Sequence, residues 1–354
     1  DLPEAEADIV GRVSGGGKVR LRDNLITLND TSLRTSEAKV NIDVRANLAT
    51  NNWNAAVNAN SLALNPFLAK VDNVGERIKD SSIFLRRADI KLAGSLNNFN
   101  PGSIRGDADL NLNVNRGNVA VYGNLNQGIL TANANVGGLG LNKLVPELPL
   151  AVTVANTKAN ISGKLNDLLE FESFDLAKLD SFRASVDGNL ILPEVKGRGR
   201  VDFNGRGNFS TNNWNLVANA NSLPISTLLS AEQKKQFRLN KLNQPVTLQR
   251  GNVKLAGNLD IINDFDLSRV NGNANLNLAV NNGRVVVDSN LNRGILQANV
   301  NANSIRANTF LPELPLPISV AYTRVNLSGR INQLLEFESI EILDKLSCYR
   351  ATAI

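Results

Sequence analysis

The stretch Gly106–Pro149 decides the fold of this chain, because it occurs twice. It reads GDADLNLNVNRGNVAVYGNLNQGILTANANVGGLGLNKLVPELP, and it returns at Gly272–Pro315 as GNANLNLAVNNGRVVVDSNLNRGILQANVNANSIRANTFLPELP. The two copies align without a gap, 166 residues apart, and agree at 24 of 44 positions. An internal repeat of this kind predicts an architecture that grows by adding units rather than separate cores.

Apolar and polar residues alternate throughout the first copy. Leu110, Leu112 and Val114 alternate with asparagines. Two further runs do the same, namely Val119, Val121, Gly123 and Leu125, and then Leu130, Ala132, Ala134 and Val136. Because successive strand residues point to opposite faces, the pattern predicts an antiparallel meander with one apolar and one polar face. Gly117 and Gly128 lie between the runs, where hairpin turns require residues that tolerate positive φ.

A finer period divides the chain into about four units. Each unit opens with a turn and leads to a strand that ends in an Asn-Ala-Asn-like run and a short apolar, helix-like segment. The turns begin at Asn47, Asn124, Asn208 and Asn290, and the apolar segments are Asn65–Leu68, Asn142–Val145, Ile225–Leu229 and Asn308–Leu311. The spacings are 77, 84 and 82 residues. We therefore expect an N-terminal partial repeat at residues 1–36, a first block of two units at 37–197 and a second block of two units at 198–354. We also expect the chain to be a fragment of a longer protein.

The composition argues against an enzyme. The chain has no His and a single Cys, Cys348, so a catalytic thiol would have no histidine base. The glycine run before Lys18 lacks the spacing of a phosphate-binding loop. The carboxylate pairs Glu170/Glu172 and Glu336/Glu338 recur in both blocks, which favours a structural role. We predict no catalytic residues, no metal site and no cofactor.

The charge of the chain is mildly basic, with a net charge of +5. Two groups of basic residues stand out, namely Lys196, Arg198, Arg200 and Arg206, and Lys234, Lys235, Arg238 and Lys241. No known motif with interleaved aromatic residues accompanies them, so nucleic-acid binding is not expected. We interpret both groups as solvated surface, with attraction to anionic lipid headgroups as the functional alternative. No apolar run is long enough for a membrane-spanning helix.

The fold class that follows is all-β, with short helical crossovers. No long amphipathic helix is predicted that could cover the apolar rows, so we expect the sheet to curl into a taco-like groove or tube with an apolar interior. The asparagines would form a hydrated outer surface that needs no asparagine ladder of the amyloid kind. The residues predicted to line the groove are Val40, Ile42, Val44, Leu48, Ile90, Leu92, Leu110, Leu112, Val114, Val119, Val121, Ile161, Leu255, Leu276, Leu278, Val280, Val285, Val287 and Leu327.

Several of these repeated segments resemble a known family. They are NANSL at Asn58–Leu62 with LNPFL at Leu64–Leu68, LNKLVPELPL at Leu141–Leu150, and ISGKLNDLLEF at Ile161–Phe171. Together with the alternating strands and the Asn-rich turns, they resemble the central repeat region of the TamB family (translocation and assembly module, AsmA-like), in its cyanobacterial or chloroplast-related type. The resemblance covers essentially the whole chain, although the family's membrane anchor and partner-binding domain are not recognised in it.

The resemblance implies a function in the cell envelope. It implies a bridge in the periplasm or intermembrane space, anchored in the inner membrane by a segment outside this sequence. Such a bridge would conduct phospholipid or another acyl-chain lipid along a hydrophobic β-groove and support outer-membrane biogenesis through a barrel partner. The alternative is a structural β-solenoid, such as an adhesin or autotransporter passenger, or a periplasmic spacer. Those usually repeat every 20–30 residues, whereas this chain repeats near 80.

Overall fold

The structure is a computed structural model, and it describes twelve stretches of the chain. These are residues 14–34, 38–65, 81–98, 100–142, 151–169, 179–192, 199–225, 246–259, 267–280, 282–306, 319–331 and 352–353. The fold is all-β, as predicted: strands make up 79% of the residues that the structure describes, and these residues include one short α-helix, α4 (Leu165–Leu169). Two short 3₁₀ turns, η1 (Pro101–Ser103) and η4 (Leu267–Arg269), complete the described elements. The chain divides into two compact units within β11 (Arg183–Leu192), and each unit is described by itself.

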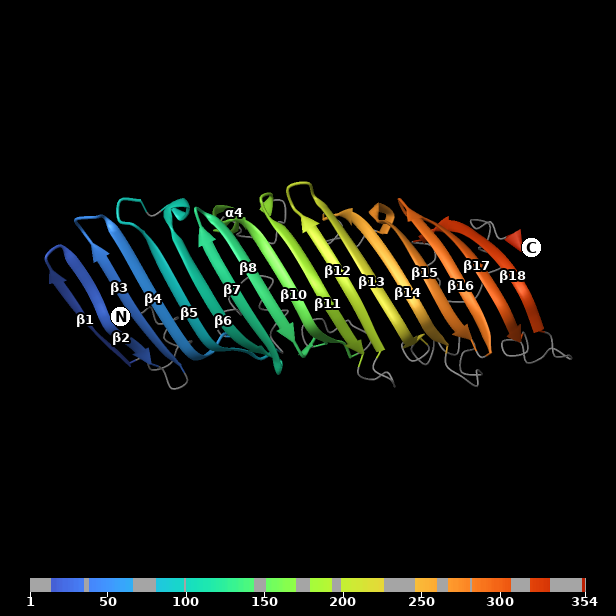
Figure 1. The fold of residues 1–354 in the computed structure, drawn as a ribbon, viewed down its shortest axis with the longest axis horizontal. Coiled ribbons are helices and arrows are strands. Elements are labelled where there is room, and N and C mark those ends of the chain that lie inside the picture. The colour runs from blue at the N-terminus through green and yellow to red at the C-terminus, as the bar shows by residue number, and fades with distance from the viewer. Residues whose placement is uncertain are drawn as a thin grey trace. The chain divides into compact units, whose positions relative to one another are not determined.

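Unit 1 holds the strands from the N-terminal side (Figure 1). They are β1 (Ser14–Arg22), β2 (Leu25–Arg34), β3 (Lys39–Asn47), β4 (Asn52–Ala63), β5 (Ile83–Ser95), β6 (Arg105–Val114), β7 (Gly117–Asn126), β8 (Ile129–Gly137), β9 (Leu139–Gly140) and β10 (Thr153–Lys164). Neighbours from β1 to β8 pair antiparallel in chain order, and β10 pairs with both β8 and β9. This is the predicted meander.

Unit 2 repeats the arrangement. Its strands are β12 (Gly199–Asn208), β13 (Asn213–Pro224), β14 (Thr247–Asn258), β15 (Asn271–Val280), β16 (Gly283–Asn292), β17 (Ile295–Arg306), β18 (Ser319–Arg330) and β19 (Thr352–Ala353). From β13 to β19 each strand pairs antiparallel with the next. The meander β6–β8 of unit 1 and the meander β15–β17 of unit 2 belong to the two copies of the repeated stretch.

Tight two-residue turns join several hairpins. Gln127 and Gly128 have φ values of 49° and 75°, and Arg293 and Gly294 have values of 47° and 78°. Two successive positive-φ residues match the right-handed twist of the flanking strands, so the prediction for Gly128 is confirmed. The prediction for Gly117 is wrong, because Gly117 is the first residue of β7. The preceding turn is made by non-glycine residues, Asn115 at 50° and Arg116 at 72°.

A residue in the left-handed backbone conformation follows the Asn-Ala-Asn-like run in each of the four sequence repeats. Ser61, Gly138, Ser222 and Ser304 all have positive φ, between 53° and 68°, directly after or near the Asn-Ala-Asn-like run. The adjacent strand also skips a residue at that level, so that Leu62 pairs with Leu85 and Leu223 pairs with Leu248. The register of each of these strand pairs is therefore the same on both sides of the interruption. The one-residue shift occurs instead against the next strand, between β5 and β6 and between β14 and β15.

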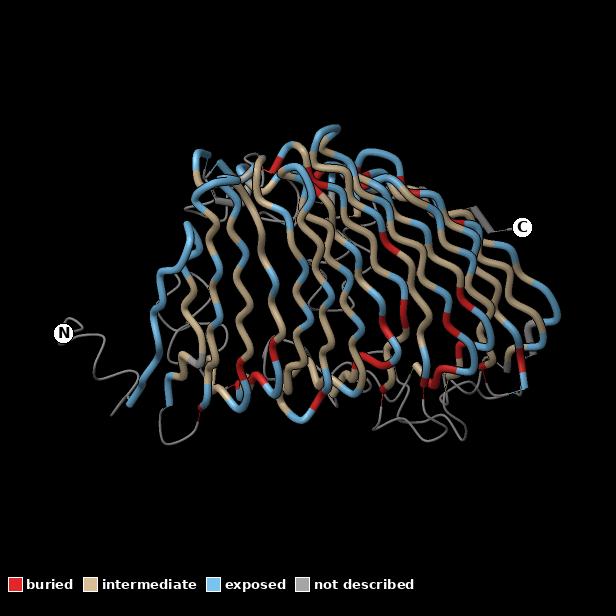
Figure 2. The backbone as a smooth tube through the Cα atoms, turned by 60° about the vertical axis from the view of Figure 1, so that its left-hand side comes forward, coloured by how far each residue is buried: buried red, intermediate tan, exposed pale blue. Residues whose placement is uncertain are grey.

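One cluster of buried apolar residues in each unit lies at and beyond this interruption. In unit 1 the cluster is Ala59, Leu85 and Ala88, and in unit 2 it is Leu192, Ala220, Leu223 and Leu248. A second cluster in unit 2 joins Val270 and Leu291, with Trp214 packed against it. Figure 2 shows most other strand positions as intermediate and the buried ones mainly toward strand ends. Each unit is therefore a sheet with local cores rather than one enclosed core.

Some sequence predictions fall outside the described residues. Cys348, the basic group from Lys234 to Lys241 and most of each helix-like apolar segment lie there. The short helix α4 follows directly after β10. The boundaries of the repeat blocks remain a sequence prediction.

Candidate functional site: the apolar sheet face

The strand register of unit 1 collects apolar residues into rows that cross β3 to β8 and β10. One row is Ile42, Val57, Ile90, Ala108, Gly123, Ala132 and Ile161. The two flanking rows are Val40, Ala59, Ala88, Leu110, Val121, Ala134 and Ala159, and Val44, Ala55, Leu92, Gly106, Leu125, Leu130 and Gly163. We call the surface that these rows form the apolar face of unit 1. None of the residues in these three rows has an ionisable side chain.

Unit 2 has an apolar face of the same kind across β13 to β18. Its rows include Ala220, Gly251, Leu276, Val287, Val300 and Val325, and Leu223, Leu248, Leu278, Val285, Ala302 and Thr323. Leu112 of unit 1 and Leu278 of unit 2 occupy equivalent positions of the repeat, 166 residues apart. Both faces combine branched aliphatic residues with Ala and Gly.

The residues predicted to line a groove lie on these two faces, with one exception. Each of those on the faces is half-buried apart from Val280, which is 7% exposed at the end of β15. Leu48 was assigned to the alternating strand before it, but it lies in the turn after β3 and is 45% exposed. The Asn47 side chain explains the earlier end of the strand, since its Oδ1 accepts hydrogen bonds from the backbone amides of Ala49 and Thr50 and fixes the turn.

Aromatic rings cover glycines at the rim of the apolar face. A Cβ at Gly94 would lie 2.9 Å from Trp53 Nε1, because the indole ring fills that space from the paired position. Trp214 pairs with Gly257 in unit 2 in the same way. Phe182, 1% exposed, lies over Gly163 of β10. These contacts shield backbone that a glycine would otherwise leave open.

The opposite face of each unit is polar and more ordered than the sequence suggested. Asparagines lie directly across from each other, as in the pair Asn219 and Asn252, where Asn252 Nδ2 donates to Asn219 Oδ1 at 2.6 Å. Asn275 Nδ2 donates to Asp288, and Arg324 Nε donates to Asn301 Oδ1 at 3.1 Å. These individual cross-strand pairs were not predicted from the sequence. Such pairs stabilise neighbouring strands.

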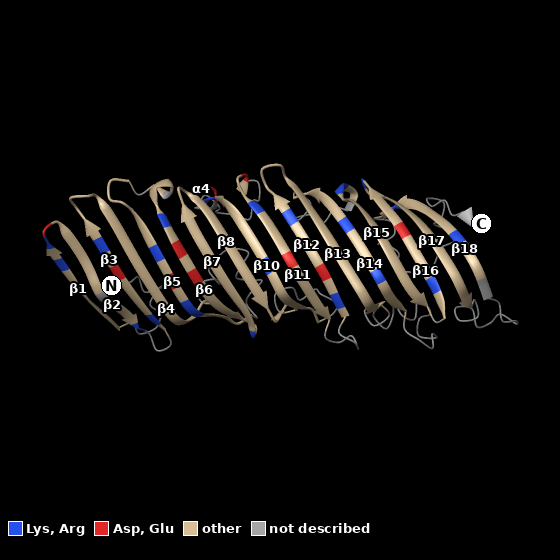
Figure 3. Ribbon diagram, viewed as in Figure 1, with Lys and Arg blue, Asp and Glu red and all other residues tan. Residues whose placement is uncertain are grey.

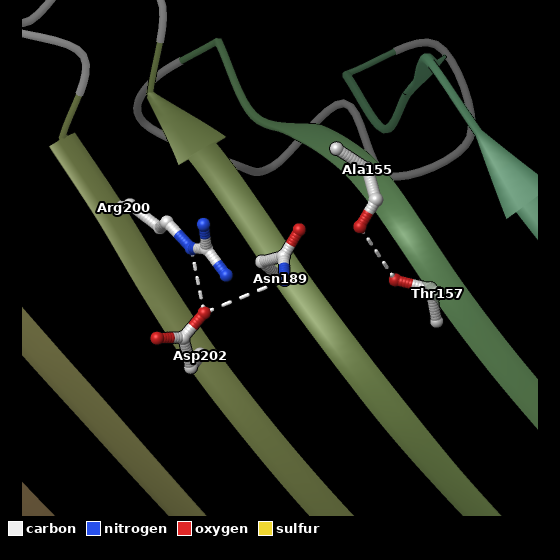
Figure 4. A network of polar contacts seen from close by, with 5 residues as sticks. All are labelled: Ala155, Thr157, Asn189, Arg200 and Asp202. Atoms are coloured by element: carbon white, nitrogen blue, oxygen red, sulfur yellow. Dashed lines mark hydrogen bonds and ion pairs between the residues drawn. The ribbon is translucent and has the colours of Figure 1, made fainter.

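Figure 4 shows one of these polar contacts at close range. Arg200 Nε donates to Asp202 Oδ1 at 2.7 Å along β12, and Asn189 Nδ2 reaches the same oxygen at 3.4 Å from β11. Arg200 belongs to the basic group noted in the sequence, and this ion pair supports its interpretation as solvated surface. In the same view, the buried Thr157 hydroxyl donates to the Ala155 carbonyl at 3.2 Å.

Sequence reasoning missed one polar cluster of unit 1, centred on Asp107. Tyr122 Oη donates to Asp107 Oδ1 at 3.1 Å, and Asn124 Nδ2 donates to the same oxygen at 2.8 Å. The Asn124 hydrogen bond, followed by that from Tyr122, lowers the pKa of the Asp107 carboxyl. The hydrogen bond between Tyr122 and Asp107, followed by the negative charge of Asp107, raises the pKa of Tyr122. The sequence signal was Asp107 and Tyr122 breaking an Asn-rich polar pattern.

Two further features of the described residues concern metal ligands and membrane-spanning helices. Within them, no group of three or more His, Cys, Asp or Glu side chains could hold a metal ion. No helix in the part of the chain that the structure describes combines the length and apolar character needed to cross a membrane. Comparisons with protein-family models, with curated proteins and with solved structures found no match for this chain.

Proposed function

We propose that the apolar faces hold the acyl chains of lipids, and that the chain is a segment of a bridge that conducts lipids between the inner and outer membranes. The observation that carries the proposal is the unbroken register of apolar rows across seven strands of unit 1. Acyl chains have no directional groups, so they require a continuous apolar surface rather than individual contacts. Rows of half-buried Val, Leu, Ile and Ala supply such a surface.

The dimensions of the face fit this proposal. A strand of ten residues at about 3.3 Å per residue measures about 33 Å, which is comparable to the hydrocarbon core of a bilayer, about 30 Å, and therefore exceeds the length of one acyl chain laid along it. Large side chains such as Leu92 lie beside small ones such as Gly106. On such an uneven surface an acyl chain can contact the large side chains laterally as well as the small ones beneath it. Curling of each face into a groove would complete the enclosure.

The remaining parts of the proposal come from the family resemblance. A place in the periplasm or intermembrane space, an inner-membrane anchor outside this sequence and an outer-membrane barrel partner all follow from the TamB-like segments. The alternative function is a structural spacer, for which the cross-strand ladders of the polar face would be sufficient. The two functions differ in one respect: a spacer needs its apolar face only for packing, whereas a conduit needs it free of charge.

A pair of charge substitutions tests the proposal. Leu112→Arg places a cation on the apolar face of unit 1, where Leu112 packs beside Ala59, Leu85 and Ala88. Its long side chain can reach toward solvent, so we expect the chain to fold. We expect lipids identified by mass spectrometry after purification to fall by about tenfold, since a desolvated charge is costly beside acyl chains.

The matched control is Asn133→Arg, which adds the same charge to the exposed polar face of β8. We expect it to leave lipid binding unchanged. Equal lipid content in both folded variants and in the wild-type chain would remove the conduit proposal and favour the spacer.

A further inference from the structure

The polar face of unit 1 contains a hollow that the proposed lipid function does not use. It has a volume of about 480 Å³ and spans β4 to β7. Its polar-face side chains are Asn54, Lys91, Arg105, Asp107, Asn124 and Asn126. Its lining also includes Ala55, Leu92, Gly106 and Leu125, which belong to one of the apolar rows. Ala56 and Ala93 leave room between them because their side chains are short. A second hollow of about 480 Å³ shares Asn54, Ala93, Arg105 and Asn126 with the first, so the two adjoin.

The hollow combines two cations with one carboxylate. Lys91 lies directly across from Asp107 in the ladder between β5 and β6, and Arg105 is two residues before Asp107 on the same face. Figure 3 shows this mixture of charges on β5 and β6. Lys91 Nζ also lies 3.9 Å from Asp89 Oδ1, a long and exposed ion pair. No ion pair or hydrogen bond of the Arg105 side chain occurs among the residues that the structure describes.

Asp107 is held in place before any ligand arrives. Its Oδ1 accepts the hydrogen bonds from Tyr122 and Asn124, which leaves Oδ2 able to accept further donors. Both hydrogen bonds favour the ionised form, so the carboxylate stays an acceptor at neutral pH. A fixed carboxylate beside an unpaired guanidinium can bind a ligand that carries both an anion and a hydrogen-bond donor.

Unit 2 provides an internal comparison for this hollow. The repeat keeps four of its side chains, which appear there as Asn215, Lys254, Asn290 and Asn292. It replaces Arg105 and Asp107 by Asn271 and Asn273, and Ala56 by the larger Val217. The two units thus differ in the guanidinium of Arg105, the carboxylate of Asp107 and the space beside Ala56. A purely structural requirement of the repeat would have applied to both units.

We propose that the hollow of unit 1 binds a small phosphorylated polyol, with its phosphate at Arg105 and Lys91 and a hydroxyl donating to Asp107. Arginine binds phosphate oxygens through two parallel N–H groups, and the flanking Asn54 and Asn126 amides supply neutral donors. The site lies on the face opposite the apolar rows, so it does not depend on lipid conduction. The chemistry fits either a soluble phosphorylated polyol or the glycerophosphate part of a lipid headgroup.

The test uses the 354-residue chain and sn-glycerol 3-phosphate as the probe, with binding measured by calorimetry. We expect millimolar or tighter binding to the wild-type chain. The double variant Arg105→Asn/Asp107→Asn, which reproduces the residues of unit 2, should bind at least about tenfold more weakly, since hydrogen bonds to charged groups are the strong ones. Circular dichroism of the variant should match the wild-type spectrum.

Controls separate the parts of the site. Arg116→Asn removes a cation at the opposite end of the same hairpin and should bind as the wild type does. Inorganic phosphate should bind more weakly than the probe, because it has no hydroxyl placed for Asp107. Vesicles of phosphatidylglycerol distinguish a lipid headgroup from a soluble ligand. If the vesicles compete with sn-glycerol 3-phosphate for the site, the natural ligand is a headgroup; if they do not compete, it is a soluble phosphorylated polyol. Undetectable binding to the wild type, equal binding to the double variant, or equal loss in Arg116→Asn would overturn the proposal.

Discussion

Ser61 on β4 and Arg86 on β5 are left out of the strand ladder at the same level. The ladder resumes beyond them at Leu62 and Leu85. Ser61 has a φ of 58°, in the left-handed region that residues with a Cβ rarely adopt. Because the register of the two strands is the same on both sides of the interruption, Leu62 packs against Ala59 and Leu85 in the local core.

Substitutions at Ser61 should therefore depend on backbone conformation rather than on polarity. We expect Ser61→Val to destabilise the chain by about 1–2 kcal/mol, because a β-branched residue is strained at positive φ. Ser61→Gly should be neutral or slightly stabilising. Ser32→Val, at a paired position of β2, is the control and should cost much less. The measurement is urea unfolding followed by circular dichroism, and equal effects of the two valines would contradict the assignment.

The contact between Gly163 and Phe182 gives a second stability prediction. An added Cβ at Gly163 would overlap the Phe182 ring, which is almost fully buried. We expect Gly163→Ala to cost about 1–3 kcal/mol, as overpacking does elsewhere. In a Phe182→Ala background the same substitution should cost little, because the ring is gone. A double-mutant cycle without coupling energy would show that the two residues do not interact as described.

The Asp107 cluster predicts two opposite pKa changes. The hydrogen bonds from Asn124 and Tyr122 lower the pKa of Asp107, so their stabilisation is complete above the unfolded-state value and is lost as the pH falls through the folded-state value. Asn124→Ala should raise the pKa of Asp107 toward its ordinary value, measured by carboxyl NMR titration. Asp107→Asn should lower the pKa of Tyr122, measured by ultraviolet absorbance in alkali. No shift in either variant would mean that the hydrogen bonds do not form in solution.

The sequence predicted the strands, their antiparallel order and the membership of the apolar face. Period-two alternation specifies which side chains share a face, and the repeat fixes equivalent positions such as Leu112 and Leu278. The left-handed serines were not predicted, because Ser rather than Gly occupies those positions and nothing local distinguishes it. The repeated NANS segment at Ser61, Ser222 and Ser304 was the available signal.

The polar hollow could not be predicted either, for a different reason. It joins residues from four strands, and their alignment depends on register that local patterns do not specify. Lys91 meets Asp107 only because η1 and the flanking turn bring β5 back beside β6 at that register. The Asn ladders have the same origin, since a residue's partner across a sheet is set by the loop that connects the two strands.

Site-specific photo-crosslinking tests the central claim most directly. A benzophenone amino acid is placed at Leu112 or Leu278 on the apolar faces, and at the exposed Asn133 or Asn299 on the polar faces. The polar controls are chosen because Asn111 and Asn277, the immediate neighbours of the two leucines, are themselves half-buried. After illumination in membranes, the protein is analysed by mass spectrometry. Acyl-lipid adducts at the leucine positions and few at the asparagines are the predicted result, whereas equal adducts on both faces, or none at the leucines, would contradict lipid binding by the apolar face.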